Sequence, residues 1–202
     1  FIRSQIQMGR QVYIIYPIID ESEKLDLKSA EENYLLLKNN IFRDYNVGMV
    51  HGRILWYEKD EVMEDFKNGK LNILVSTTVI EVGIDIPNAT VMIIEESQRF
   101  GLSQLHQLRG RVGRGAQRAY AYFFRHRKLQ PSIEGRQRLE TIAENTQLGA
   151  GYSIAMRDLE IRGAGDILGT RQSGQIAAVG FHLYTRLLAD SVRRLKRERN
   201  LQ

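Results

Sequence analysis

The side chains best suited to chemistry in this chain are two arginines in a segment that also holds amides and glycines, residues 104–115. Four polar residues of this segment recur every three or four positions and would share one face of a helix: Gln104, Gln107, Arg111 and Arg114. Planar guanidinium groups bind multiply charged oxyanions such as phosphate through paired hydrogen bonds. A solvated basic helix is the alternative, although Gly110 and Gly113 would each cost such a helix about 1 kcal/mol relative to alanine. The pattern therefore favours a phosphate-binding face.

A second polar segment, residues 76–87, begins where an expected strand meets the start of a helix. Its hydroxyl groups and free backbone N–H groups could converge on a phosphate. Asp85 lies between two isoleucines, where a carboxylate needs a donor, either an arginine of the same domain or a ligand hydroxyl. Taken alone, the Ser-Thr-Thr sequence would also suit an ordinary helix cap. Together with residues 104–115 it favours phosphate binding.

Alternating strands and helices would position these segments. Continuous apolar runs predict buried parallel strands at residues 12–19, 46–50, 71–75, 90–94 and 119–124. Helices are expected between them, within residues 25–40, in the segment that carries Trp56, Val62, Met63 and Phe66, and at residues 104–115. This order indicates a doubly wound α/β layer, in which ligands gather at the carboxyl ends of the strands. His51, Ser76 and Glu95 each stand at the end of an expected strand.

The pattern changes after Pro131. Residues 132–145 and 152–161 predict a helical hairpin, with Leu139, Ile142 and Ala143 turned inward in the first helix. Residues 162–174 hold four glycines in thirteen positions and predict a shaped loop. An amphipathic helix is expected at residues 181–196. We therefore divide the chain into a domain at residues 1–130 and a second one at residues 131–202.

Composition and charge narrow the class of protein. The chain has 202 residues, of which 43% are hydrophobic, and no apolar run is long enough to cross a bilayer. It contains no cysteine, which excludes disulfides and thiolate metal sites and favours a reducing, cytoplasmic location. The absence of an initiator methionine suggests a fragment of a longer protein.

The net charge of +5 is unevenly distributed along the chain. Residues 20–65 hold twelve acids and six Lys or Arg, whereas residues 97–133 hold eight Lys or Arg and no acid. Such a basic segment is the usual electrostatic footprint of a polyanion partner. The alternative is a solvated face that is balanced by acids from elsewhere in the fold.

Residues 12–115 resemble the second RecA-like domain of a superfamily-two helicase. Residues 107–114 match the sixth motif of that family, Gln-x-x-Gly-Arg-x-x-Arg, and residues 76–87 match the fifth. Within the superfamily, residues 100–114 are similar to the double-stranded DNA translocases RecG and the transcription-repair coupling factor. Residues 162–174, behind a helical hairpin, resemble the translocation motif that these two share.

The two subfamilies match different parts of the chain. Residues 16–24 and 76–87 are similar to RecG, a fork-remodelling helicase, whereas residues 148–152 and 175–184 are more similar to the coupling factor. Because the tail continues past Gly174 in the manner of the coupling factor, we favour that type. A non-catalytic nucleic-acid-binding or protein-binding module is a further alternative, and so is an RNA helicase, which lacks the Gly-rich tail.

The resemblance implies roles for the motif residues. Arg114 would be the arginine finger and Arg111 a second γ-phosphate contact, and such a finger can be worth about 10³ to 10⁵ in kcat. Gln107 would couple the site to movement, and Gly83 and Asp85 would approach the nucleotide ribose. The residues that would grip DNA or transmit closure of the two lobes to the duplex are His51, Gly52, Arg53, Thr77, Thr78, Arg162, Arg171 and Gln172.

Two motifs of such motors are absent from the sequence. It has no Gly-x-x-x-x-Gly-Lys-Ser/Thr phosphate loop and no acidic magnesium motif, both of which belong to the first lobe. ATP with Mg²⁺ would therefore bind together with a first RecA-like lobe, and this chain alone should hydrolyse no ATP. The implied partners are double-stranded DNA, that first lobe and, for a coupling factor, RNA polymerase, with no membrane and no metal ligands from this chain.

Overall fold

The computed structural model describes residues 1–18, 23–77, 86–113, 117–126, 130–145 and 150–162. The chain divides into two compact units, Phe1–Leu139 and Glu140–Gln202. The division falls inside a helix, a little after the boundary at Pro131 that we expect from the sequence.

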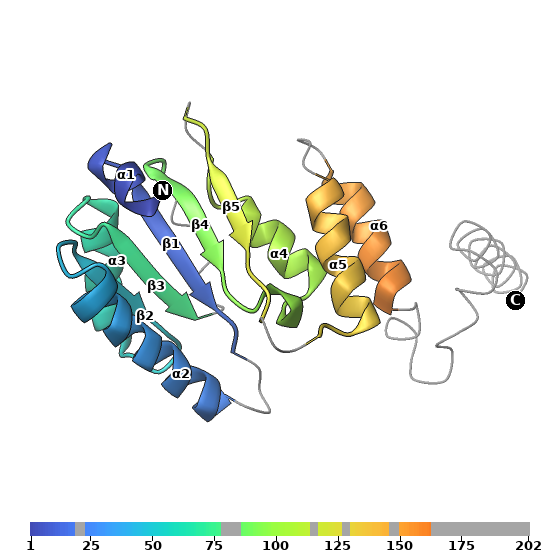
Figure 1. Ribbon diagram of the computed structural model, residues 1–202, viewed down its shortest axis with the longest axis horizontal. Helices are drawn as coiled ribbons and strands as arrows, with labels where there is room; N and C mark the ends of the chain where they lie inside the picture. Colours follow the sequence, from blue (N-terminus) through green and yellow to red (C-terminus); the bar gives the residue numbers. More distant parts are fainter. Residues whose placement is uncertain (19–22, 78–85, 114–116, 127–129, 146–149, 163–202) are drawn as a thin grey trace, which may run out of the picture. The chain divides into compact units, whose positions relative to one another are not determined.

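The first unit is built on a parallel sheet of five strands in the order β2-β3-β1-β4-β5 (Figure 1). The strands are β1 (Gln11–Tyr16), β2 (Val47–Val50), β3 (Ile73–Thr77), β4 (Ala89–Ile94) and β5 (Tyr120–Phe123). The expected strands and their parallel arrangement are confirmed. β1 stops before Pro17, which has no N–H to donate to a neighbouring strand.

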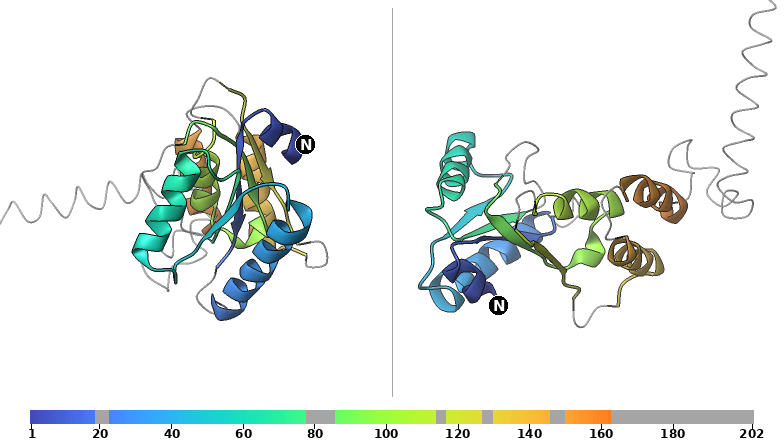
Figure 2. Two further views of the ribbon diagram at one scale, coloured as in Figure 1. Left: turned by 90° about the vertical axis from the view of Figure 1, so that its left-hand side faces the viewer. Right: turned by 90° about the horizontal axis from the view of Figure 1, so that it is seen from above.

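Helices cover both faces of this sheet, as Figure 2 shows for the first unit. On one face lie α1 (Ile2–Gln7) and α2 (Glu23–Leu36), which continues into a wider π-helical turn, η2 (Leu37–Ile41). On the other lie α3 (Trp56–Lys67) and α4 (Leu102–Arg109), the latter preceded by a short 3₁₀ turn, η3 (Ser97–Arg99). This is the doubly wound α/β architecture that the alternating pattern predicts.

Side chains of the central strand alternate between the two faces. Val12 and Ile14 join a buried cluster beneath α1 that also includes Ile6. Tyr13 points to the opposite face, where its ring meets the ring of Phe66 from α3 edge-on at 4.9 Å. Both layers are therefore anchored on β1, which fixes the positions of the strand ends.

The second part of the chain contains α5 (Ile133–Glu144) and α6 (Gly151–Arg162), so the two helices expected after Pro131 are confirmed. Ile142 is buried as predicted, but Ala143 is exposed, and its inward orientation is therefore wrong. The Ser153 hydroxyl donates to Asn145 Oδ1 at 3.1 Å and links the first turn of α6 to the residue that follows α5. The expected loop at residues 163–174 and helix at residues 181–196 lie outside the described residues. None of the helices in the described part combines the length and apolar character needed to cross a bilayer.

Removing the Phe66 ring should destabilise the first unit strongly. Phe66 is fully buried against Tyr13, and Phe66→Ala should lower the free energy of unfolding by about 3–5 kcal/mol. Trp56→Ala is the matched control, because Trp56 begins the same helix but is 74% exposed, and it should change that free energy by less than about 0.5 kcal/mol. Urea unfolding of both variants measures the difference, and equal losses would contradict the packing described here.

Candidate functional site

Three of the polar positions predicted from the sequence lie at the carboxyl edge of the sheet. His51 follows β2, Thr77 ends β3 and Glu95 follows β4. Because the strands are parallel, their ends meet at one edge. Thr77 is only 2% exposed in this unit, and its contact with DNA stays a prediction. Thr77 remains in register beside β1, opposite Tyr16.

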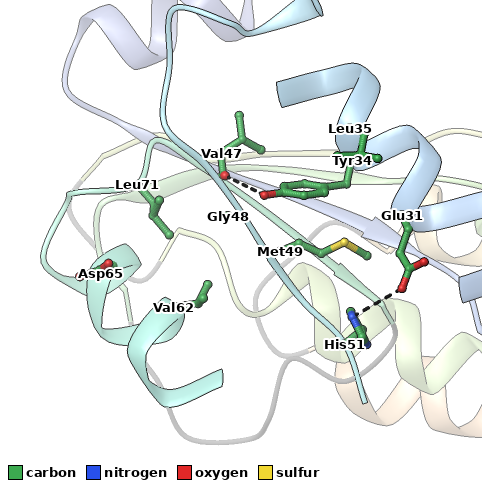
Figure 3. Close-up of a pocket in the computed structure, with 10 residues that line it drawn as sticks. All are labelled: Glu31, Tyr34, Leu35, Val47, Gly48, Met49, His51, Val62, Asp65 and Leu71. Carbon is green, nitrogen blue, oxygen red and sulfur yellow. Dashed lines mark hydrogen bonds and ion pairs between the residues drawn. The ribbon is translucent and has the colours of Figure 1, made fainter. Parts of the chain in front are cut away.

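His51 is held by two neighbours rather than directed outward (Figure 3). Its Nδ1 accepts a hydrogen bond from the backbone N–H of Arg53 at 3.2 Å, and its Nε2 lies 3.8 Å from Glu31 Oε1 of α2. The imidazole is 13% exposed, whereas Gly52 and Arg53 are exposed. His51 therefore fixes the turn after β2, and that turn presents Gly52 and Arg53 to solvent.

A groove of about 560 Å³ runs along β2 between α2 and α3 (Figure 3). Gly48 lies in its wall, and a Cβ there would stand 2.5 Å from Leu71 Cδ1, so a larger residue would require the Leu71 side chain to move. The groove is lined by Glu31, Tyr34, Leu35, Val47, Gly48, Met49, His51, Val62, Asp65 and Leu71. This lining includes two carboxylates and no lysine or arginine, which does not suit the binding of phosphate.

A smaller cavity of about 370 Å³ lies beside the ends of β1 and β4. Arg99 forms a two-pronged ion pair with Asp26, with N···O distances of 3.0 and 2.7 Å, and also reaches Glu96 at 3.0 Å. Burial and the nearby charge of Glu95 raise the pKa of Tyr16 to about 12. Burial also raises the pKa of Glu95, with a smaller contribution from Glu96. Sequence reasoning missed the Arg99 pair, because its partner lies 73 residues away in the chain.

The helix expected at residues 104–115 is shorter than predicted. α4 ends at Arg109, Gly110 forms its C-cap, and Gly113 has a left-handed φ of +83°. Glycine at the end of a helix permits this change of direction. Gln104 Oε1 accepts the Gly101 N–H at 2.9 Å and thereby caps the helix start. The prediction of one helical face shared by four polar residues is therefore wrong. The leucines of α4, Leu102, Leu105 and Leu108, are buried.

Arg111 lies in the turn after α4 and is half-buried. Its backbone N–H donates to Leu108 O at 2.9 Å, while its guanidinium forms no hydrogen bond or ion pair with any residue that the structure describes. A Cβ on Gly113 would lie 3.0 Å from Ala119 Cβ, immediately before β5. The segment that carries Arg111 thus lies beside the start of β5, whereas His51 follows the end of β2, at the opposite edge of the parallel sheet.

Gln107 is exposed near the end of α4, and Arg111 follows it by four residues in the turn after the helix. Both side chains can donate to an oxyanion from outside this unit. Arg162 is the last residue of α6, and its side chain is outside the described part of the chain. The other predicted site residues that lie outside the described residues are Thr78, Gly83, Asp85, Arg114, Arg171 and Gln172.

His106 is a further polar residue of α4, which the sequence analysis did not single out. Arg109 Nη2 lies 3.2 Å from His106 Nδ1, and because a guanidinium can only donate, Nδ1 is the acceptor. Burial lowers the pKa of His106, and the charge of Arg109 lowers it further. This helix therefore carries a neutral imidazole beside a cation, close to the segment of Arg111.

Replacing Arg109 should raise the pKa of His106. The folded-state pKa of His106 lies below the ordinary 6.5, so protonation of its imidazole opposes folding. The stability contributed by the neutral imidazole is present above pH 6.5 and is lost as the pH falls from 6.5 through the folded-state pKa. In Arg109→Gln the pKa should rise toward 6.5 but stay below it, because burial remains. NMR titration of the imidazole protons measures this shift. Arg43→Gln, which removes an exposed arginine of the same unit, is the control, and an equal pKa in both variants would contradict the pairing.

Comparison with known proteins identifies the family to which this chain is similar. A family model described as the helicase conserved C-terminal domain matches residues 1–116. The ATP-dependent DNA helicase RecG of Synechocystis sp. is 51% identical over 173 residues, which are 86% of this chain and 20% of that protein. The transcription-repair-coupling factor of Staphylococcus haemolyticus is 50% identical over 149 residues, 74% of this chain and 13% of its own length.

Among solved structures, that of RecG bound to a three-way DNA junction matches with a TM-score of 0.66 and 46% identity. The match covers 82% of this chain and 20% of that one, so the chain spans about a fifth or less of these relatives. The resemblance to RecG and the coupling factor is confirmed, and the parallel sheet with helices on both faces is the RecA-like fold. This chain belongs to the family of the helicase conserved C-terminal domain.

Proposed function

We propose that this chain is the C-terminal motor lobe of an ATP-dependent DNA translocase. The observation that carries the proposal is the unpaired guanidinium of Arg111, among the described residues, on a segment within the helicase family match. A half-buried arginine without an acidic partner in the described part of its lobe suits a phosphate brought by another lobe. The similarity to RecG and to the coupling factor supports DNA rather than RNA as the track.

We further propose a RecG-type rather than a coupling-factor-type motor, which reverses the preference drawn from the sequence alone. At nearly equal identity, the similarity to the Synechocystis RecG extends over 173 residues and that to the staphylococcal coupling factor over 149. The solved RecG with a three-way DNA junction adds support at 46% identity. The coupling-factor type remains the alternative, and RNA polymerase would then be a partner. For either type we propose a location in the bacterial cytoplasm.

In this proposal ATP lies between two lobes, and its hydrolysis supplies the free energy for movement. Arg111 and Arg114 donate to the γ-phosphate, Gln107 couples the site to movement, and Gly83 and Asp85 approach the ribose. The first lobe contributes the phosphate loop and the Mg²⁺ ligands. An arginine suits this role because its guanidinium has only hydrogen-bond donors. It can therefore bind the phosphate oxygens and cannot act as a ligand of the Mg²⁺ ion.

We propose that duplex DNA is bound through its phosphates at the turn after β2. Gly52 and Arg53 are exposed there, and His51 positions them through its contact with Glu31. Thr78, Arg162, Arg171 and Gln172 complete the proposed DNA and translocation contacts. Binding that uses phosphates is independent of sequence and weakens as salt rises.

The role of Arg111 can be tested in the full-length protein. Arg111→Ala should lower the DNA-stimulated kcat for ATP hydrolysis by about 10²–10³, the loss typical of one transition-state donor. Arg111→Lys should restore little of it, because an ammonium lacks the planar pair of donors. Steady-state ATPase assays with saturating duplex measure both.

Arg43→Ala is the matched control for this experiment. Arg43 is an exposed arginine of the same unit, paired with Asp44 at 3.7 Å, and its removal should leave the ATPase rate unchanged. An Arg111→Ala protein that hydrolyses ATP at the normal rate would favour a non-catalytic binding module. The 202-residue chain alone should show no DNA-stimulated hydrolysis.

A further inference from the structure

An exposed row of aromatic rings runs along β5, the last strand of the sheet. Tyr120, Tyr122 and Phe124, here called the aromatic stripe, alternate along the chain and so point to the same face. Neighbouring ring centroids are 6.4 Å apart, and each pair of ring planes is inclined by only 9°. Phe1 meets the rings of Tyr120 and Tyr122 edge-on, at 5.1 and 5.6 Å. The stripe is therefore an ordered array of nearly parallel rings.

Exposure increases along the aromatic stripe in the direction of the strand. Tyr120 packs partly against the core cluster beneath α1, whereas Tyr122 is 37% and Phe124 is 48% exposed. The backbone beneath the rings is fixed, since the Phe124 N–H donates to Ile94 O at 2.8 Å. The Phe124 carbonyl accepts from both the N–H and the hydroxyl of Ser97, at 2.7 and 2.8 Å. Exposed rings on a rigid strand mark an interaction site rather than a solvated loop.

Arginines stand at both ends of the aromatic stripe. The guanidinium of Arg118 lies over the Tyr120 ring, 5.4 Å from its centroid, and Arg125 directly follows Phe124. Both are exposed, and neither forms a hydrogen bond or ion pair with an acid within the described ranges of the chain. Arg125 also lines the cavity that holds Asp26, Glu95 and Glu96, so the positive charge is strongest at the Arg118 end of the stripe. That end is complementary to a polyanion.

We propose that the aromatic stripe binds single-stranded DNA, with bases stacked on its rings and phosphates against Arg118 and Arg125. Aromatic side chains beside a positive surface are the usual means of holding a single strand without sequence preference. A duplex fits less well, because its bases are already stacked on one another and cannot reach protein rings unless they are flipped out. The site uses none of the residues proposed above for ATP or duplex DNA, so it would be an additional activity of this unit.

The direct test measures binding of a fluorescein-labelled oligothymidine of about 20 nucleotides, longer than the roughly 4–16 nucleotides that one single-strand-binding fold covers. The Tyr122→Ala/Phe124→Ala double variant of the 202-residue chain should bind it about tenfold or more weakly, since at least one stacked base is lost. Tyr152→Ala is the matched control, because Tyr152 is 77% exposed on α6, and it should bind normally. Equal affinity of the double variant and the control would overturn the proposal.

The electrostatic part of the site has a separate readout. Arg118→Gln should reduce the slope of log K against log salt concentration by about 0.7, the change expected for one phosphate contact with a single strand. The aromatic double variant should keep the slope of the unmodified chain. A slope unaffected by Arg118→Gln would exclude that arginine from the site.

A gain-of-signal variant guards against effects of misfolding. Trp56 is the one tryptophan of the chain, so Trp56→Phe with Tyr122→Trp places a single tryptophan in the aromatic stripe. Its fluorescence should be quenched by the oligothymidine and not by a blunt duplex of the same length. Quenching by the duplex alone, tighter binding of the matching RNA, or a dimer of this chain that Tyr122→Ala dissociates would each overturn the assignment. Loss of ATPase activity in Arg111→Ala tests the motor lobe independently of these results.

Discussion

The parallel sheet is the constraint on which the arrangement of this protein depends. Strands that all run the same way require every connection to cross back to the starting edge. Residues that directly follow a strand, such as His51 and Glu95, therefore gather at one edge. Residues that follow a returning helix, such as Arg111 after α4, are carried to the other edge. The parallel direction of the strands therefore places the turn that we propose to bind DNA and the arginine that we propose to bind nucleotide at opposite edges of the same sheet.

The sequence predicted the strands well because each is a short apolar run bounded by polar residues or glycine, and burial between two helical layers demands that pattern. It predicted the end of α4 poorly, because the four polar residues continue the helical spacing past the glycines. A periodic pattern shows which face a residue would take if the helix continued, but Gly110 and Gly113 decide that it does not. The end of β3 was also predicted short, since the strand extends two residues beyond the apolar run and includes Ser76 and Thr77, which are buried.

Contacts between distant segments could not be inferred from local patterns at all. The pair between Arg99 and Asp26 joins η3 to α2 across 73 residues. Glu96, which completes the network, has a φ of +46°, a strained conformation for a residue other than glycine. The ion pairs hold that turn in place while the chain passes from β4 into α4. The start of α4, and with it the orientation of Gln107, is therefore set partly by an acid of a helix on the opposite face of the sheet.

The lack of acidic residues near Arg111 in the sequence has a consequence for phosphate binding. An acid close to Arg111 in the chain would form an ion pair with it, and a phosphate arriving from another lobe would have to displace that acid. Residues 97–133 contain no acid, so no such competitor is available nearby in the chain. Because Arg111 is only half-buried, water can solvate its charge until a ligand arrives, so the absence of an acidic partner among the described residues costs little. In the motor lobe that we propose, the absence of acids from this segment is as necessary as Arg111 itself. Without a nearby acid to bind it, Arg111 can bind phosphate when the two lobes close.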